Sequence, residues 1–435
     1  MLESKVTTIE KQLKTVFGES ALEKIGRQTG FIQRNRTITA TKFAGSLLYS
    51  LGRRKVETIA DLHRDFNSDN DIFVNYKPFY EKLDKEGFPS FTRTLFEEMM
   101  SVMYLKVLSP LKDGPFASFR DIVVHDGSSF ALHDALRDVF PGRFTTISPA
   151  AVELHTTMSI FHDNLTTVTI TADSECERHY TPDARELRGK LFMGDRGFDS
   201  TAYMIEIDRN GGSFLIRIRS TLKPKVVKIR RLGRKYRKLE GKRLDQVLEA
   251  VPKSKLLDMD VCWEKPNGET VCSFRMVASY NRSDKSWMRL MTNLPLRLFS
   301  AKTILRAYRL RWQVELYFKE LKSYANLHRF CTAKATIAEG LFWASLCVAF
   351  LKRYFAHACQ HACPGRDIST RRVAMCGHAF LGPLFFSMLR RFRGLRDALR
   401  KAFLFIFNNA MRSNPGRERK KGRLACGLAT VGGSS

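Results

Sequence analysis

Paired cysteines, long apolar runs and acidic charge are scarce in this sequence of 435 residues. Its nine cysteines are an odd number and none stands in a Cys-x-x-Cys pair, so we expect reduced thiols rather than a disulfide framework. The longest apolar stretch, Leu341 to Leu351, has eleven residues, whereas a membrane-spanning helix needs about 20. We therefore expect a buried helix there and no membrane partner. Met1 to Phe17 has no continuous apolar segment, which predicts no secretory signal and a cytoplasmic protein.

Acidic residues are outnumbered, because 73 Lys and Arg stand against 44 Asp and Glu and give a formal charge of +29. Such an excess repels itself unless a polyanion neutralises it, which makes nucleic acid the leading partner. Hydrophobic residues make up 44% of the chain and Phe alone occurs 32 times. This composition excludes a globally disordered protein.

The hydrophobic periodicity changes along the chain and indicates several regions. Residues 1–112 show helical spacing and predict a helical N-terminal DNA-binding domain. Inside it, Thr58 to Phe66, a polar turn and a helix near Tyr80 fit either a helix-turn-helix that enters a DNA groove or an ordinary helical hairpin. From Arg120 onward, short apolar runs and alternating segments predict strands, and helices between them indicate an α/β or α+β class.

Residues 222–295 form a basic, β-rich insertion in that pattern. Eleven of the 21 positions from Lys223 to Arg243 are Lys or Arg. We expect this segment to contact DNA, with Lys225, Arg230 and Arg231 as candidate contacts, and solvated strands as the alternative.

The C-terminal region, residues 356–435, is predicted to be helical to about Phe407. Basic residues from Arg390 to Arg423 suggest a second surface for DNA or for dimerisation, and the stretch from Asn414 through the Gly/Ser-rich ending predicts a disordered basic tail.

Two aspartates stand out because each follows an apolar run that predicts a buried strand. Asp126 lies in His-Asp-Gly-Ser-Ser and Asp195 lies in Gly-Asp-Arg-Gly-Phe. Carboxylates at strand ends are well placed to hold a metal ion, although both sequences also suit simple turns.

The run from residue 308 to 322 has no Gly or Pro and predicts one helix. At about 100° per residue, its Tyr308, Arg311, Glu315 and Lys322 fall within a stripe of about 60° beside the core-facing sector. A solvated, salt-bridged helix is the alternative, but it would not require a tyrosine in register.

The ordered set Tyr308-x2-Arg311-x3-Glu315-x6-Lys322, with Asp126 and Asp195, resembles the DDE insertion-sequence transposases that carry the Tyr-Arg-Glu-Lys signature, the insertion-sequence-four type. The resemblance covers residues from about 25 to 355. Supporting stretches are Thr29-Gly-Phe-Ile, Asp126-Gly-Ser-Ser, Phe140-Pro-Gly-Arg, Leu154-His, Thr181-Pro-Asp, Gly194-Asp-Arg-Gly-Phe-Asp-Ser, Gly211-Gly-Ser-Phe-Leu and Leu290-Met-Thr-Asn-Leu.

The resemblance implies a ribonuclease-H-like catalytic core, residues 113–221 and 296–355, interrupted by the β-rich insertion, with helical regions at both ends. It implies that Asp126, Asp195 and Glu315 are catalytic ligands of two Mg²⁺ ions, with Mn²⁺ able to substitute. Clustered carboxylates repel one another unless such cations neutralise them.

The family also implies DNA-binding roles. Arg311 and Lys322 would hold phosphates at the transposon end, and Tyr308 would pack or hydrogen-bond beside them. Members of the family stack a flipped base on a tryptophan near the position of Trp287, for which packing within a strand is an equal alternative.

The implied function is a transposase that binds terminal inverted repeats, cleaves double-stranded DNA at the element ends and joins them to target DNA as a homodimer. A bacterial, cytoplasmic and nucleoid-associated location follows from the same resemblance. Two other interpretations stay open: a non-catalytic DNA-binding protein or inactive transposase remnant, and a metal-dependent nuclease without strand transfer.

Overall fold

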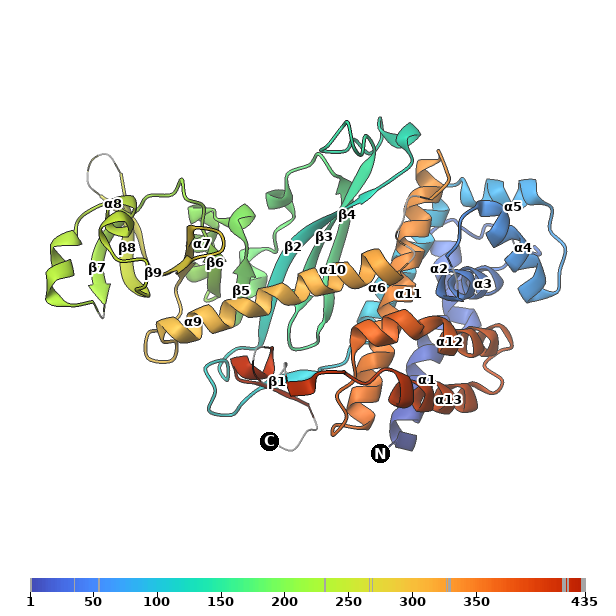
Figure 1. Cartoon of the computed structure of the whole chain (residues 1–435). Coiled ribbons are helices and arrows are strands. Elements are labelled where there is room, and N and C mark those ends of the chain that lie inside the picture. The colour runs from blue at the N-terminus through green and yellow to red at the C-terminus, as the bar shows by residue number, and fades with distance from the viewer. Residues whose placement is uncertain are drawn as a thin grey trace.

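The computed structural model describes residues 2–34, 36–53, 55–230, 232–265, 267, 269–325, 327, 330–416, 420 and 422–431. Arg231, one of the candidate DNA contacts, lies outside the described residues. A mixed sheet runs through the middle of the molecule, the helices of both chain ends gather on one side of it, and strands of the basic insertion lie at the opposite end (Figure 1). The expected mixture of sheet and helices is confirmed.

The first five strands of the main sheet carry the predicted aspartates. In space they run in the order β4-β3-β2-β5-β6, with β2, β5 and β6 parallel and with β3 and β4 antiparallel to their neighbours. The strands are β2 (Asp121–Ala131), β3 (Ala151–Ser159), β4 (Asn164–Ala172), β5 (Lys190–Gly194) and β6 (Ser213–Arg217). Every residue of β3, which lies second from the edge of the sheet, is buried.

The insertion extends the same sheet. Its strands are β7 (Lys225–Arg230), β8 (Leu257–Glu264), β9 (Thr270–Asn281) and β10 (Ser286–Thr292). Strand β10 pairs antiparallel with β6, so the described strands form one sheet of nine in the order β4-β3-β2-β5-β6-β10-β9-β8-β7. A separate hydrophobic cluster fills the insertion and reaches helix α7 (Thr201–Arg209).

The N-terminal region is helical, as its periodicity predicts. Thr58 caps α4 with a capping box, in which its side chain and that of Asp61 each bond the other's backbone N–H. The two helices of the possible helix-turn-helix are α4 and α5. The bounds are α1 (Leu2–Phe17), α2 (Glu19–Gln28), α3 (Ala40–Arg53), α4 (Ile59–Asn70), α5 (Tyr76–Leu83) and α6 (Gly87–Val102).

The predicted helix of the Tyr-Arg-Glu-Lys stripe is helical but not a single α-helix. Its first turn, Tyr308–Arg311, is a tighter 3₁₀ turn between α9 (Ala301–Ala307) and α10 (Trp312–Tyr324). The three pieces follow one another along one line across the sheet (Figure 1). The expected continuous α-helix is therefore corrected at its start.

Long helices complete the C-terminal half: α11 (Ala335–Ala362), α12 (Thr370–Leu389) and α13 (Leu395–Asn409). By length and composition α11 and α12 are apolar enough to cross a bilayer. However, the most apolar stretch of α11 is 78% buried inside the protein, and that of α12 is 50% buried. Helix α11 packs on α6 and α12 packs on α3. The buried helix predicted around Leu341 to Leu351 is confirmed.

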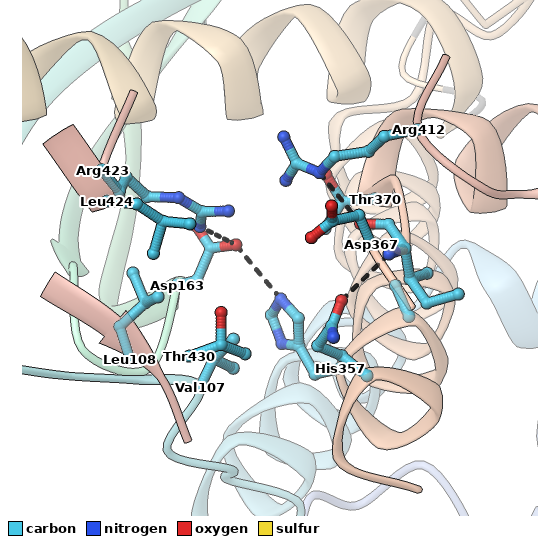
Figure 2. Close-up of a pocket in the computed structure, with 13 residues that line it drawn as sticks. Val107, Leu108, Asp163, His357, Asp367, Thr370, Arg412, Arg423, Leu424 and Thr430 are labelled. Carbon is cyan, nitrogen blue, oxygen red and sulfur yellow. Dashed lines mark hydrogen bonds and ion pairs between the residues drawn. The ribbon is translucent and has the colours of Figure 1, made fainter. Parts of the chain in front are cut away.

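The predicted disordered tail is wrong for residues 422–431. Strand β11 (Leu428–Thr430) pairs with β1 (Leu108–Pro110), and Arg423 is only 8% exposed. A guanidinium nitrogen of Arg423 lies 2.7 Å from the carboxylate of Asp163, which also faces His357 (Figure 2). A basic residue that sequence composition assigns to solvent is thus held by a buried counter-ion.

Candidate active site

The two predicted aspartates lie side by side. The parallel strands β2 and β5 pair with a constant offset, from Asp121 with Lys190 to Val124 with Met193. Continuing the same register places Asp126 opposite Asp195, where β5 has just ended. Asp195 follows a strand end, as predicted, and accepts a 2.6 Å hydrogen bond from the N–H of Arg196.

Asp126 differs from the prediction, because it lies inside a strand and not after one. Strand β2 continues to Ala131 since β3 still pairs with it beyond the end of β5. Asp126 is therefore paired with β3 on one side. On its other side β5 has already ended, and the chain there continues as Asp195.

Glu315 comes from α10, and Arg311 connects it to the sheet. The Arg311 guanidinium donates to an Asp126 carboxylate oxygen at 3.1 Å and, one helical turn along, to Glu315. The Arg311 side chain is 11% exposed, so this cation lies buried between two acidic groups. Arg311 thus bridges two of the three predicted acidic residues, and Asp195 lies near enough to act on the same guanidinium through its charge.

The environment of Asp126 favours its neutral form. Burial raises the pKa of this carboxyl to about 7, and the nearby carboxylates of Asp195 and Glu315 act in the same direction. The Arg311 guanidinium and the N–H of Gly127 oppose the shift without cancelling it. A cation bound here in addition to Arg311 would therefore favour the ionised form of Asp126.

Tyr308 positions the end of β5. Its hydroxyl donates to the carbonyl oxygen of Gly194 at 3.3 Å, directly before Asp195. Burial raises the pKa of Tyr308, and the negative charge of Asp195 adds to this effect. The hydroxyl accordingly stays protonated and available as a donor.

Lys322 extends the stripe toward β2. Its ammonium lies 5.3 Å from the ring centre of Phe130, four residues after Asp126 on β2, and the side chain is solvent-exposed. By contrast, Lys319 lies over the ring of Trp312 on its own helix, at 5.2 Å. The stripe therefore faces the strands that carry the aspartates, as its phase on the helix predicts.

A second acidic pair, Glu153 and Glu177, which the sequence did not indicate, lies near Gly127 and Gly197. A methyl group at Gly127 would lie 2.5 Å from Glu153 Oε1, and one at Gly197 would lie 3.2 Å from Glu177 Oε2. Glu153 is 1% exposed, and burial together with Glu177 raises its pKa to about 8. The guanidinium of Arg143 bonds Glu153 at 2.7 Å. The only signal in the sequence was that Arg143 ends the Phe-Pro-Gly-Arg stretch.

The remaining predicted DNA contacts lie away from this centre. Trp287 is half-buried in β10 and its ring meets that of Tyr280 edge-on at 5.5 Å, as in the packing alternative. Lys225 pairs with Glu264 at 2.9 Å, and Arg230 pairs with Asp260 at 2.6 Å. Acidic residues of β8 thus neutralise cations that look unpaired in the sequence.

The acidic residues suit a hard divalent cation by donor type, because Mg²⁺ and Mn²⁺ prefer carboxylate oxygens. Among the described residues, no three His, Cys, Asp or Glu side chains are close enough to form a metal site as they stand. Arg311 supplies the positive charge between Asp126 and Glu315 instead. By donor type the three carboxylates fit such an ion, which would compete with Arg311 for Asp126 and Glu315.

Comparison with known proteins identifies relatives. Residues 117–351 match the protein family described as "Transposase DDE domain". The transposase for insertion sequence element IS1151 of Clostridium perfringens is 21% identical over 364 residues, 75% of this chain and 76% of that protein. The transposase for insertion sequence element IS231C of Bacillus thuringiensis subsp. berliner is 20% identical over 76% of each chain.

A shorter match, 42% identical over 62 residues, covers 14% of this chain and 17% of the putative transposase InsL for insertion sequence element IS186A of Escherichia coli (strain K12). Among solved structures, the piggyBac transposase synaptic complex with hairpin DNA aligns with a TM-score of 0.47 and 10% identity, over 94% of this chain and 88% of that one.

Proposed function

The chain belongs to the DDE transposase family, and from that premise we propose that it binds the terminal inverted repeats of a bacterial insertion sequence, cleaves the DNA at the element ends and joins them to target DNA. The observation that carries this proposal is the meeting of Asp126, Asp195 and Glu315 around Arg311. Asp126 lies in β2, Asp195 directly follows the adjacent parallel strand β5, and Glu315 comes from the helix that crosses them.

The strand order supports a ribonuclease-H-like core. A three-stranded antiparallel unit, β2-β3-β4, is continued by β5 and β6 parallel to β2, and the insertion enters after β6. The insertion-sequence-four assignment rests on Tyr308, Arg311, Glu315 and Lys322, all of which face β2 or the end of β5.

We assign Asp126, Asp195 and Glu315 as the ligands of two Mg²⁺ ions, which Mn²⁺ can replace. When bound, such ions activate a water or a 3′-hydroxyl and stabilise the leaving oxygen of an in-line displacement at phosphorus. Tyr308 fixes the strand end that presents Asp195, while Arg311 bridges the other two carboxylates. Asp126 must lose its proton before it can act as a ligand.

The partner is double-stranded DNA, and the working form is a homodimer because two element ends must be held together. Lys322 is an exposed cation of α10 whose ammonium lies over Phe130 of β2, and we assign it to a phosphate of the scissile strand. Trp287 is retained as a candidate for a flipped base, and Lys225 and Arg230 as weaker candidates for backbone contacts. A cytoplasmic, nucleoid-associated location follows from this assignment.

The test uses purified protein and duplexes that carry the flanking element ends. Mg²⁺ or Mn²⁺ should support nicking and joining to a second duplex, whereas EDTA should abolish both. Binding without metal-dependent cleavage would instead indicate a non-catalytic DNA-binding protein or an inactive remnant. Cleavage without joining would indicate a nuclease.

A further inference from the structure

A cavity of about 310 Å³ is lined in part by Lys322, and Asp126, Asp195 and Glu315 do not belong to its lining. It lies where α3, α10, α11 and α12 meet, and its charged or ionisable lining residues are Arg53, Lys55, Lys322, Lys352 and His378. No carboxylate belongs to this lining among the residues that the structure describes. The wall is therefore basic, and it begins at the end of the helix that carries Glu315.

Lys352 is the unusual member of this wall. It is 6% exposed, yet its ammonium makes one hydrogen bond, 2.7 Å to the carbonyl oxygen of Tyr324 at the end of α10. Within the described part of the chain, no Asp or Glu pairs with it. A buried ammonium has three donors and costs free energy unless an anion compensates it. Burial lowers its pKa to about 8, so most of it stays charged at neutral pH.

The aliphatic stem of Lys352 packs against Gly377 of α12. A methyl group at Gly377 would lie 2.6 Å from Lys352 Cε and 2.9 Å from Cδ. A side chain at position 377 would push this stem aside, and His378 follows directly on the cavity wall. The position of the ammonium is thus built by two helices rather than left to a flexible surface side chain.

Arg53 and Lys55 complete the wall from the end of α3. Arg53 is held by Asp65 at 2.5 Å and lies 4.6 Å over the ring of Tyr49, which fixes its direction. Lys55 is exposed and has a loose contact of 3.6 Å with Glu57. Fixed and adaptable cations around one cavity are the arrangement expected for a phosphate group.

We propose that this cavity binds a backbone phosphate of DNA, with Lys55, Lys322 and Lys352 among its cations. The proposal rests on the proposed function, because that function supplies the DNA. It adds Lys352 and Lys55 as positioning residues that join the N-terminal helices to the catalytic helix. A free phosphate ion has the same chemistry and is distinguished by the test.

The test measures the salt dependence of duplex binding in EDTA, so that cleavage is not required. Each lost phosphate contact lowers the slope of log K against log salt by about 0.9. Lys352→Met and Lys55→Ala should each show this decrease. Lys319→Ala removes the same charge from α10 outside the cavity and should leave the slope unchanged. Gly377→Ala should reproduce the Lys352→Met slope with every charge retained, because it displaces the stem of Lys352.

Lys55→Ala alters only an exposed side chain and keeps the test valid if Lys352→Met fails to fold. Wild-type slopes for Lys55→Ala and for folded Gly377→Ala would overturn the proposal. Stabilisation of the wild type by inorganic phosphate, lost in Lys55→Ala without any change in DNA slope, would assign the cavity to a free anion and overturn the DNA assignment. Absence of metal-dependent cleavage would refute the proposed function and would leave these slopes interpretable.

Discussion

At the scale of single residues, the acidic centre predicts a specific pattern of loss. Asp126→Asn, Asp195→Asn and Glu315→Gln should each abolish cleavage while leaving binding of end DNA largely intact, because each removes a metal ligand and a repulsive charge. Gel-shift and nicking assays on the same preparations measure both. Near wild-type nicking by any one of these variants would exclude that residue from the site.

The raised pKa of Asp126 predicts a pH dependence of stability. With a folded pKa of about 7 against an ordinary value near 4, the folded protein binds a proton that the unfolded chain has already released. The contribution of the Asp126 carboxyl to the free energy of unfolding is therefore fully present at low pH and is lost as pH rises toward 8. Asp126→Asn should be spared a loss of about 3 kcal/mol between pH 5 and pH 8. Urea unfolding of metal-free protein measures it, and parallel curves for both proteins would contradict it.

The proton on Asp126 also competes with Mg²⁺ for the carboxylate. At limiting Mg²⁺ the cleavage rate should rise through about pH 7, because the ligand must be deprotonated, and the midpoint should move to lower pH as Mg²⁺ is increased. Single-turnover rates over a grid of pH and Mg²⁺ measure this. A midpoint that does not respond to Mg²⁺ would assign the pH dependence to another group.

At the scale of elements, α10 separates two lysines that have equal charge. Lys322 points toward β2 over Phe130, whereas Lys319 lies over Trp312 on the outer surface. Lys322→Ala should slow single-turnover cleavage roughly tenfold or more, and Lys319→Ala much less, because a contact that positions the reacting phosphate depends on geometry. Binding is measured separately in Ca²⁺. Equal losses would leave only a general effect of a basic helix.

Within the insertion, we expect the 3₁₀ helix Arg234–Leu239 to contact DNA in preference to the paired cations. Its Arg234, Lys235, Arg237 and Lys238 are exposed, whereas Lys225 and Arg230 face acidic partners. Neutralising the four should lower the salt slope by about 0.9 for each phosphate lost. Neutralising Lys225 and Arg230 is the matched control and should change it less. An unchanged slope for the fourfold variant would make the segment a solvated face.

At the scale of the whole molecule, Asp163 joins parts of the chain that are far apart in sequence. Its carboxylate lies 2.8 Å from Arg353 of α11 and 2.7 Å from Arg423 near the C-terminus. Arg353 also bonds Glu320 of α10 at 2.6 Å. Helix α10 is therefore braced from the side opposite to the acidic centre.

Removing this carboxylate should be costly. Asp163→Asn leaves buried arginines without their counter-ion and should lower the free energy of unfolding by about 3 kcal/mol. Its pKa lies well below the usual range because of these arginines, so its contribution is present at neutral pH and is lost as pH falls. Asp183→Asn, which breaks an exposed pair with Arg185, is the control and should change stability little. Equal effects of the two substitutions would contradict the bracing role.

The sequence by itself determined the candidate acidic residues and the direction of the helix stripe. Asp126 and Asp195 could be found because apolar runs precede them, and Glu315 because Tyr308, Arg311 and Lys322 share its helical phase. These signals are local: a period of 3.6 or 2 residues is visible in a short window. The spacing of the aspartates also equals the register offset of β2 and β5, although only the fold shows that these strands are adjacent.

The tertiary structure alone decided which charges meet. The placement of Arg311 between Asp126 and Glu315 is one such result, and the burial of Lys352 beside Gly377 is another. Likewise, only the fold shows that the insertion strands belong to the core sheet. It also shows that Arg423, in a stretch whose composition predicts disorder, pairs with Asp163. Composition and periodicity describe each segment alone, whereas the energy of a buried charge depends on a partner that is often more than a hundred residues away.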